Sequence, residues 1–177
     1  MKDQEVIDYG WEDYLRELDD KLSYVDVGIL SSNNQSSESG KITLAELASV
    51  QEFGISIAVT PKMRAYLRGT GLPLKPGTTE ITIPERPFMR QTFDEQLPQL
   101  EDMADKLERE ILTKKKTKRL ALSELGQAHR QQIQANMADA EKFEPNHPYT
   151  LEKKAPKTTP LIGKSGRLRQ AIDFEVG

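Results

Sequence analysis

Residues 143–176, FEPNHPYTLEKKAPKTTPLIGKSGRLRQAIDFEV, decide how this chain closes its fold. Prolines punctuate the first half of this segment and favour a loop there. They are Pro145, Pro148, Pro156 and Pro160. The second half predicts a short turn or helix at 165–170 and a strand at 171–176. We expect this last strand to pair with an early strand, so that both ends of the chain complete one fold.

The composition limits the classes of protein to consider. Of the 177 residues, 36% are hydrophobic and 30% are charged, which predicts a single domain, 1–177, with a modest core. The absence of cysteine excludes disulfides and thiolate metal sites, and it fits a reducing cytosol. No apolar run is long enough to cross a bilayer, and the acidic start differs from a signal peptide. We therefore expect no membrane partner.

The net charge of -3 is unevenly distributed along the chain. Residues 1–60 carry four Lys or Arg and twelve Asp or Glu, whereas the remaining residues carry 21 and 16. Opposite charges on different parts of a surface favour head-to-tail packing of identical subunits. A solvated acidic helix face would give the same pattern.

Hydrophobic spacing predicts mixed secondary structure in the first half of the chain. Apolar residues from Trp11 to Leu22 recur at helical spacing, which predicts an amphipathic helix within residues 1–23. Thr43 and Glu46 form a capping box, and Gly54 is suited to end the helix that they begin. The other predicted elements are a strand at 24–31, a mobile polar loop at 31–40, a strand at 55–59, a short helix at 60–67, a mobile loop at 69–79 and a strand at 79–83.

The second half of the chain predicts a long helical hairpin at 87–140. Apolar positions keep helical spacing through both arms of the hairpin, Pro98 predicts a kink, and the basic turn KKKTKR lies at 114–119. The predicted fold is α+β, a small and mostly antiparallel sheet packed against this hairpin, with extended loops and a C-terminal strand at the end of segment 143–176.

No residue pattern predicts catalysis. Gly163, Lys164 and Ser165 match the end of a phosphate-binding loop, but Thr158 stands where that loop requires glycine. His129 and His147 are the only histidines, and neither lies in a metal-binding or nucleophilic motif. We therefore expect a non-enzymatic protein without a cofactor or metal.

Two groups of basic residues raise the question of nucleic-acid binding. One is the turn at 114–119, and the other lies between Lys153 and Arg169. Aromatic residues that could stack on bases do not interleave with either group. Specific recognition is not expected, whereas nonspecific contact with DNA stays open.

Three motifs in a fixed order carry a family resemblance. They are VQEFGI at 50–55, IPERPFMR at 83–90, and PNHPYTLEKK with TPLIGKSGRLRQAIDFEV within 145–176. Together with the helical spacer, they resemble the virion morphogenesis proteins of tailed bacteriophages. This family of neck and tail-completion proteins includes minor tail protein Z-like members. The chain departs from its pattern at Glu85, in the turn 163–166 and in a longer segment at 56–79.

The first two motifs have expected structural roles. Phe53 should anchor the core at a helix end, where Gly54 permits a positive φ. Pro87 should start the long helix and Phe88 should pack beneath the sheet. The two arginines of the second motif, Arg86 and Arg90, are expected outside the core, either solvated or paired with acids of a neighbouring subunit.

The third motif supplies further contact residues. Ser165 should cap the turn that contains Gly166 and Arg167, while Leu168 and Ile172 face inward. Arg167 and Arg169 are the strongest candidates for subunit or partner contacts, because arginine can hold carboxylates with two parallel bonds.

The resemblance implies a structural protein of the phage particle, assembled in the host cytoplasm. It implies tail completion or head-tail joining by a homo-oligomeric ring or collar at the head-tail junction or tail end. Other phage neck and tail proteins would be the partners. The alternative is a DNA-associated neck or packaging accessory protein that contacts phosphates through the basic segments.

Overall fold

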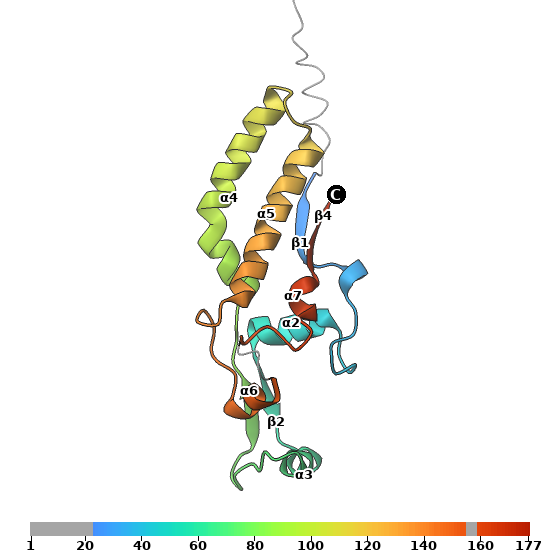
Figure 1. Cartoon of the computed structure of the whole chain (residues 1–177), viewed down its shortest axis with the longest axis vertical. Coiled ribbons are helices and arrows are strands. Elements are labelled where there is room, and N and C mark those ends of the chain that lie inside the picture. The colour runs from blue at the N-terminus through green and yellow to red at the C-terminus, as the bar shows by residue number, and fades with distance from the viewer. Residues whose placement is uncertain (1–22, 155–158) are drawn as a thin grey trace, which may run out of the picture.

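The computed structural model describes residues 23–154 and 159–177, so the helix predicted at 11–22 lies outside the described residues. The described part is elongated (Figure 1). A long helical hairpin occupies one end, and a thin two-stranded extension occupies the other. The predicted α+β class is confirmed. Among the described residues, no helix is both long and apolar enough to span a membrane.

The helical hairpin consists of α4 (Phe88–Leu112) and α5 (Lys118–Ala138), as predicted for 87–140. Thr117 begins α5 by accepting a hydrogen bond from the backbone N–H of Leu120. Between the helices, the buried Asn136 Nδ2 donates to Thr92 Oγ1 at 2.8 Å. This bond joins the start of α4 to the end of α5.

The chain's last strand pairs with its first described strand, as predicted. Strands β1 (Val25–Ile29) and β4 (Ile172–Val176) are antiparallel, with Val27 opposite Phe174. Helix α5 covers this pair, and Gly126 allows close approach. A Cβ at this position would lie 2.5 Å from a methyl carbon of Val25.

A separate strand pair forms the opposite end. Strands β2 (Ile55–Ala58) and β3 (Glu80–Ile83) are antiparallel and do not join the β1–β4 pair. The prediction of one small sheet is therefore wrong, because strand pairing depends on where the intervening helices direct the chain. Between β2 and β3 lies α3 (Pro61–Gly69), which Thr60 caps.

Helix α2 (Leu44–Phe53) connects the two ends of the molecule. Thr43 and Glu46 form the predicted capping box, and Gly54 ends the helix with φ 66°. Both features were readable from short sequence patterns, because caps involve neighbouring residues.

The remaining elements are short. They are η1 (Ser31–Asn33), α6 (Pro148–Lys154) and α7 (Arg167–Gln170). The predicted loop in the first half of 143–176 is therefore wrong over α6, because Pro148 stands at the first position of this helix, where proline is tolerated. The polar segment predicted as a loop at 31–40 contains one buried residue, Ser37, whose N–H donates to Ile42 O at 2.8 Å.

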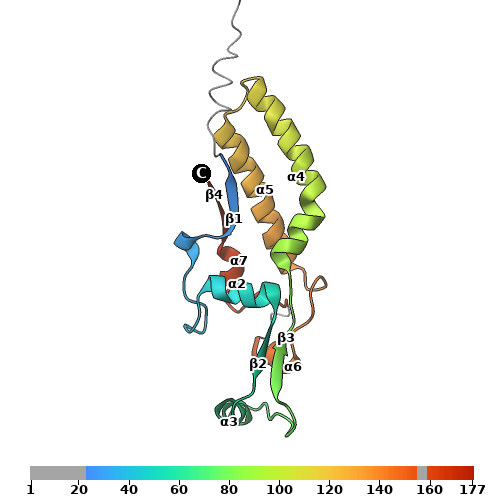
Figure 2. The same cartoon turned by 180° about the vertical axis from the view of Figure 1, so that it is seen from behind.

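The core lies where α2, α7, the start of α4 and the end of α5 meet (Figure 2). Phe88 and Ile172 are fully buried there, and Leu168 faces inward as predicted. The buried hydrophobic members of this cluster are Leu44, Ala48, Phe88, Ile133, Met137, Phe143, Leu161, Leu168, Ala171 and Ile172.

Candidate interaction site

The three sequence motifs meet at one junction through the side chain of Arg86. Its Nε donates to Glu144 O at 2.8 Å, and its Nη1 donates to Gln51 Oε1 at 2.8 Å. Its Nη2 contacts Pro145 O at 3.5 Å and Asn146 Oδ1 at 3.3 Å. One guanidinium group therefore ties the end of α2 and the C-terminal segment to the entrance of α4.

Arg86 is 3% exposed, so the prediction that it lies outside is wrong. Burial lowers the pKa of its guanidinium group, while the charge of Glu144 opposes that shift. The acceptors that surround it are carbonyl and amide oxygens. The planar guanidinium group has N–H donors that point in several directions, so one arginine can donate to all of these oxygens.

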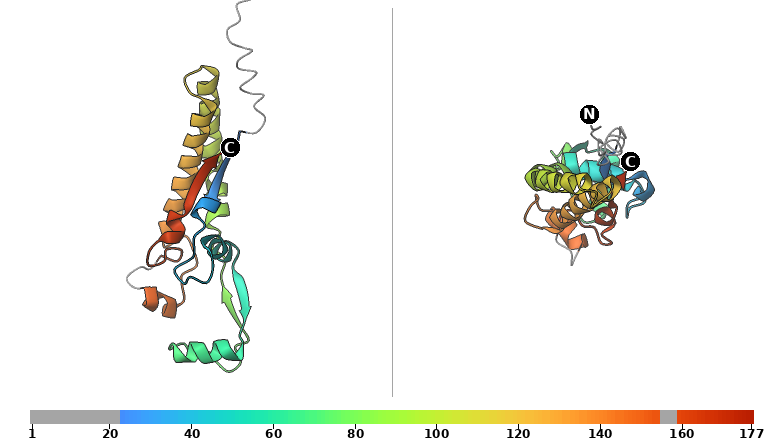
Figure 3. Two further views of the ribbon diagram at one scale, coloured as in Figure 1. Left: turned by 90° about the vertical axis from the view of Figure 1, so that its right-hand side faces the viewer. Right: turned by 90° about the horizontal axis from the view of Figure 1, so that it is seen from above.

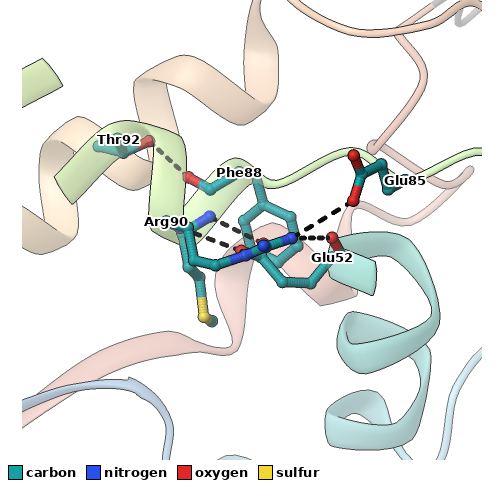
Figure 4. A network of polar contacts seen from close by, with 6 residues as sticks. Glu52, Glu85, Phe88, Arg90 and Thr92 are labelled. Atoms are coloured by element: carbon teal, nitrogen blue, oxygen red, sulfur yellow. Dashed lines mark hydrogen bonds and ion pairs between the residues drawn. The ribbon is translucent and has the colours of Figure 1, made fainter. Parts of the chain in front are cut away.

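Glu52 forms the second part of the junction (Figure 4). This residue is 5% exposed, and its carboxylate accepts the backbone N–H groups of Met89 and Arg90, both at 3.0 Å. It therefore caps the N-terminus of α4, where a negative charge is favourable. Pro87 lies directly before this helix, as predicted, within one residue of its start.

Arg90 completes this network from the surface. Its side chain is 51% exposed, and its Nε donates to Glu52 Oε1 at 3.0 Å. Its Nη2 also lies 3.6 Å from a carboxylate oxygen of Glu85. The charged partners that the structure gives Arg90 are therefore acids of its own chain.

Phe53 is 63% exposed, so its predicted place in the core is wrong. The guanidinium carbon of Arg90 lies 4.8 Å from its ring centroid, a cation–π contact at the surface. The adjacent Gly54 has the predicted positive φ. A Cβ on Gly54 would lie 2.9 Å from both Glu85 N and Ile83 O, so the chain needs glycine where it enters β2.

The two C-terminal arginines have partners within the chain. Arg169 Nε donates to Gln134 O at 2.7 Å, and Arg167 Nη2 donates to Gln35 Oε1 at 3.1 Å. Arg167 and Arg169 are partly exposed, and their predicted contacts with partners stay predictions. Because Arg86 is buried, the four predicted contact arginines do not form one exposed surface.

The Gly163–Ser165 turn holds a carboxylate of the same chain. Ser165 donates to Glu38 Oε1 through its N–H at 2.7 Å, and its hydroxyl contacts the same oxygen. Ser165 therefore does not cap α7 as predicted. Gly166 precedes α7 instead, in the left-handed conformation with φ 72°.

The thin extension, residues 55–83, lies outside the hydrophobic core of the fold. We call it the arm; it consists of β2, α3, a loop and β3. None of its residues is buried, although all of them are described. Figure 3 shows it projecting from the body, with α3 crossing its tip. Sequence reasoning predicted its elements but did not indicate that they leave the core.

Backbone and polar contacts hold the arm together. Arg64 donates from its two terminal nitrogens to Lys75 O at 2.9 Å and Thr78 O at 2.5 Å. Tyr149 on α6 donates its hydroxyl to Thr70 O at 3.0 Å, which ties the arm to the body. Large apolar side chains remain exposed, with Tyr66 at 68% and Ile55 at 43%.

The structure also contains a cavity and a half-buried histidine. A cavity of about 410 Å³ lies between α2, α6 and the 160–168 segment, and its lining includes Gln51 and Lys153. His129 on α5 is half-buried against Phe93, and burial lowers its pKa. Within residues 23–154 and 159–177, no group of three or more His, Cys, Asp or Glu side chains could hold a metal.

Comparisons with protein-family models, curated proteins and solved structures gave no match. The phage resemblance of the three motifs therefore stays a prediction.

Proposed function

We propose that this chain is a non-enzymatic structural protein that acts by self-association. Its place in a tailed-phage particle, at the head-tail junction or the tail end, rests on the resemblance of the three motifs. There it would complete the tail or join it to the head as part of a ring or collar.

The projecting arm carries this proposal. An isolated two-stranded hairpin is marginally stable in water, and no residue of the arm is buried. In the isolated subunit, Tyr66 and Ile55 leave 68% and 43% of their surface exposed to water. A contact that covers them would stabilise the arm and provide binding energy at the same time.

The junction at the base of the arm supports the same proposal. VQEFGI enters the arm and IPERPFMR leaves it, and Arg86 and Glu52 anchor both segments to the body. Buried charged groups with several hydrogen bonds fix a single geometry. Such a base would present the arm at a defined angle, which closed assemblies require.

Contact with DNA through the basic turn at 114–119 has weaker support. Lys116 Nζ lies 2.8 Å from a carboxylate oxygen of Glu110 and 2.7 Å from one of Glu124. Part of the positive charge of this turn is therefore neutralised within the chain.

Two measurements test the proposed function. Analytical ultracentrifugation of the purified chain should show oligomers that form with increasing protein concentration. Deletion of the gene from its phage should give filled heads and tails that fail to join, or tails of aberrant length. A chain that remains monomeric at high concentration, together with intact infectious particles after deletion, would reject the proposal.

A further inference from the structure

Resting on the proposed self-association, we propose that the arm of one copy docks on a surface of α4 in a second copy. That surface, the α4 stripe, consists of Asp94, Leu97, Glu101, Asp105 and Glu108. The contact would be head-to-tail, between two different surfaces of identical chains.

The arm presents positive charge beside apolar groups. Lys62, Arg68 and Lys75 are exposed on it, whereas its one acid, Glu80, accepts a bond from Ser56 at 2.9 Å. Tyr66 is 68% exposed and lies one helical turn after Lys62 on α3, so these two side chains share one side of the helix. An exposed aromatic ring beside a cation is a suitable anchor for an acidic and apolar surface.

The α4 stripe has the opposite charge. Its members follow one another at intervals of three or four residues, so they lie on one side of the helix. All five residues are exposed. Leu97, the one apolar member, lies among the four acids and is 39% exposed. Among the ion pairs of the described residues, the acids that α4 contributes are Glu95 and Glu110, and neither belongs to the stripe.

The shape of the molecule excludes docking within one copy. The tip of the arm lies at the end of the molecule opposite the α4–α5 turn, with the core between them (Figures 1 and 3). Charge complementarity therefore pairs the arm with the stripe of another copy. Because the two surfaces differ, repetition of this contact generates a ring or a filament.

Charge reversal provides the first test. An arm variant carries Lys62→Glu and Arg68→Glu, and a stripe variant carries Glu101→Lys and Asp105→Lys. Each variant alone would face like charges at every contact, so we expect its self-association to weaken by at least about tenfold. In a one-to-one mixture, alternating copies regain opposite charges at every contact, and association should return close to the wild-type level.

Site-specific crosslinking provides the second test, since the natural chain contains no cysteine. A Gly69→Cys chain, which keeps Tyr66 and places the thiol one turn further along α3, is mixed with a Leu97→Cys chain and treated with a short bismaleimide. The matched control replaces Leu97→Cys with Leu120→Cys, because Leu120 is 50% exposed but lies on α5. We expect at least about fivefold more crosslinked heterodimer with Leu97→Cys than with the control.

The outcomes separate the docking from the function. Oligomers that tolerate both reversals, or a mixture that does not recover, would overturn the docking while leaving self-association in place. Equal crosslinking to both leucine positions would also overturn it. A wild-type chain that stays monomeric would overturn the docking and the proposed self-association together.

Discussion

Replacement of Arg86 tests whether the junction of the three motifs is a buried structural centre. Arg86→Met removes a charged donor whose neighbours include Gln51 Oε1 and Glu144 O, each at 2.8 Å. Hydrogen bonds from charged groups contribute about 1.5–3 kcal/mol each, and the desolvation of the guanidinium group offsets part of that gain. We expect the free energy of unfolding to fall by about 3 kcal/mol, a roughly hundredfold loss in the folding equilibrium constant.

Arg90→Met is the matched comparison, because both arginines belong to IPERPFMR. The Arg90 side chain is 51% exposed, and Glu52 keeps its two bonds to backbone N–H groups when Arg90 is replaced. We expect a loss of about 1 kcal/mol, close to the upper range for exposed ion pairs. Arg109→Met, on the exposed face of α4, should change stability by less than about 0.5 kcal/mol.

Urea unfolding at pH 7, followed by circular dichroism, measures all three variants. A lower midpoint with an unchanged slope reports lost stability rather than an altered unfolded state. Arg86→Lys should recover less than half of the lost stability. The three guanidinium nitrogens of Arg86 each have acceptors of their own, and the single ammonium group of lysine cannot reach all of these acceptors. If Arg86→Met costs no more than Arg90→Met, the buried junction is not a source of stability and the reasoning fails.

Two further predictions concern the helical hairpin. Gly126→Ala would place a Cβ 2.5 Å from Val25 and 2.7 Å from Phe174, so it should lower stability by about 1–3 kcal/mol despite the higher helix propensity of alanine. Gly69→Ala, with no neighbouring atom within 4 Å, should be neutral or slightly stabilising, and equal melting temperatures for the two variants would contradict the prediction. Burial lowers the pKa of His129 below its ordinary value of 6.5, so the unfolded chain binds more protons than the folded chain as the pH falls through that value. Stability should therefore decrease as the pH falls from 7.5 to 5.5, a range that lies above the pH at which carboxylates titrate. Calorimetry of His129→Gln should show a weaker dependence of stability on pH, and an unchanged dependence would show that His129 is not the cause.

Local sequence signals predicted most of the secondary structure. Thr43 with Glu46, and Thr60 before Pro61, mark the starts of α2 and α3, where the side chains bond backbone groups three residues away. Gly54 marks the end of α2 because its positive φ is a property of one residue. Such features depend on neighbours in the chain, so they can be read without the tertiary structure.

Side-chain environment was predicted less well, because it depends on distant segments. Arg86 resembles a surface residue in sequence, yet its acceptors lie 35 and 58 residues away in the chain. Phe53 resembles a core residue, yet it lies where α2 turns outward into the arm and is 63% exposed. The spacing of apolar residues within VQEFGI and IPERPFMR does not indicate which distant segment packs against either motif.

The sequence by itself determined most of the helices and strands of this protein, the caps of α2 and α3, and the return of segment 143–176 to pair with the first strand. Hydrophobic spacing and turn residues specify these features within a few positions. Only the tertiary structure decided that the strands form two separate pairs, that residues 55–83 leave the core as an arm, and that Arg86 is buried while Phe53 is not. Those outcomes depend on contacts between segments far apart in the chain, and their combined packing selects one arrangement among many that the local signals allow.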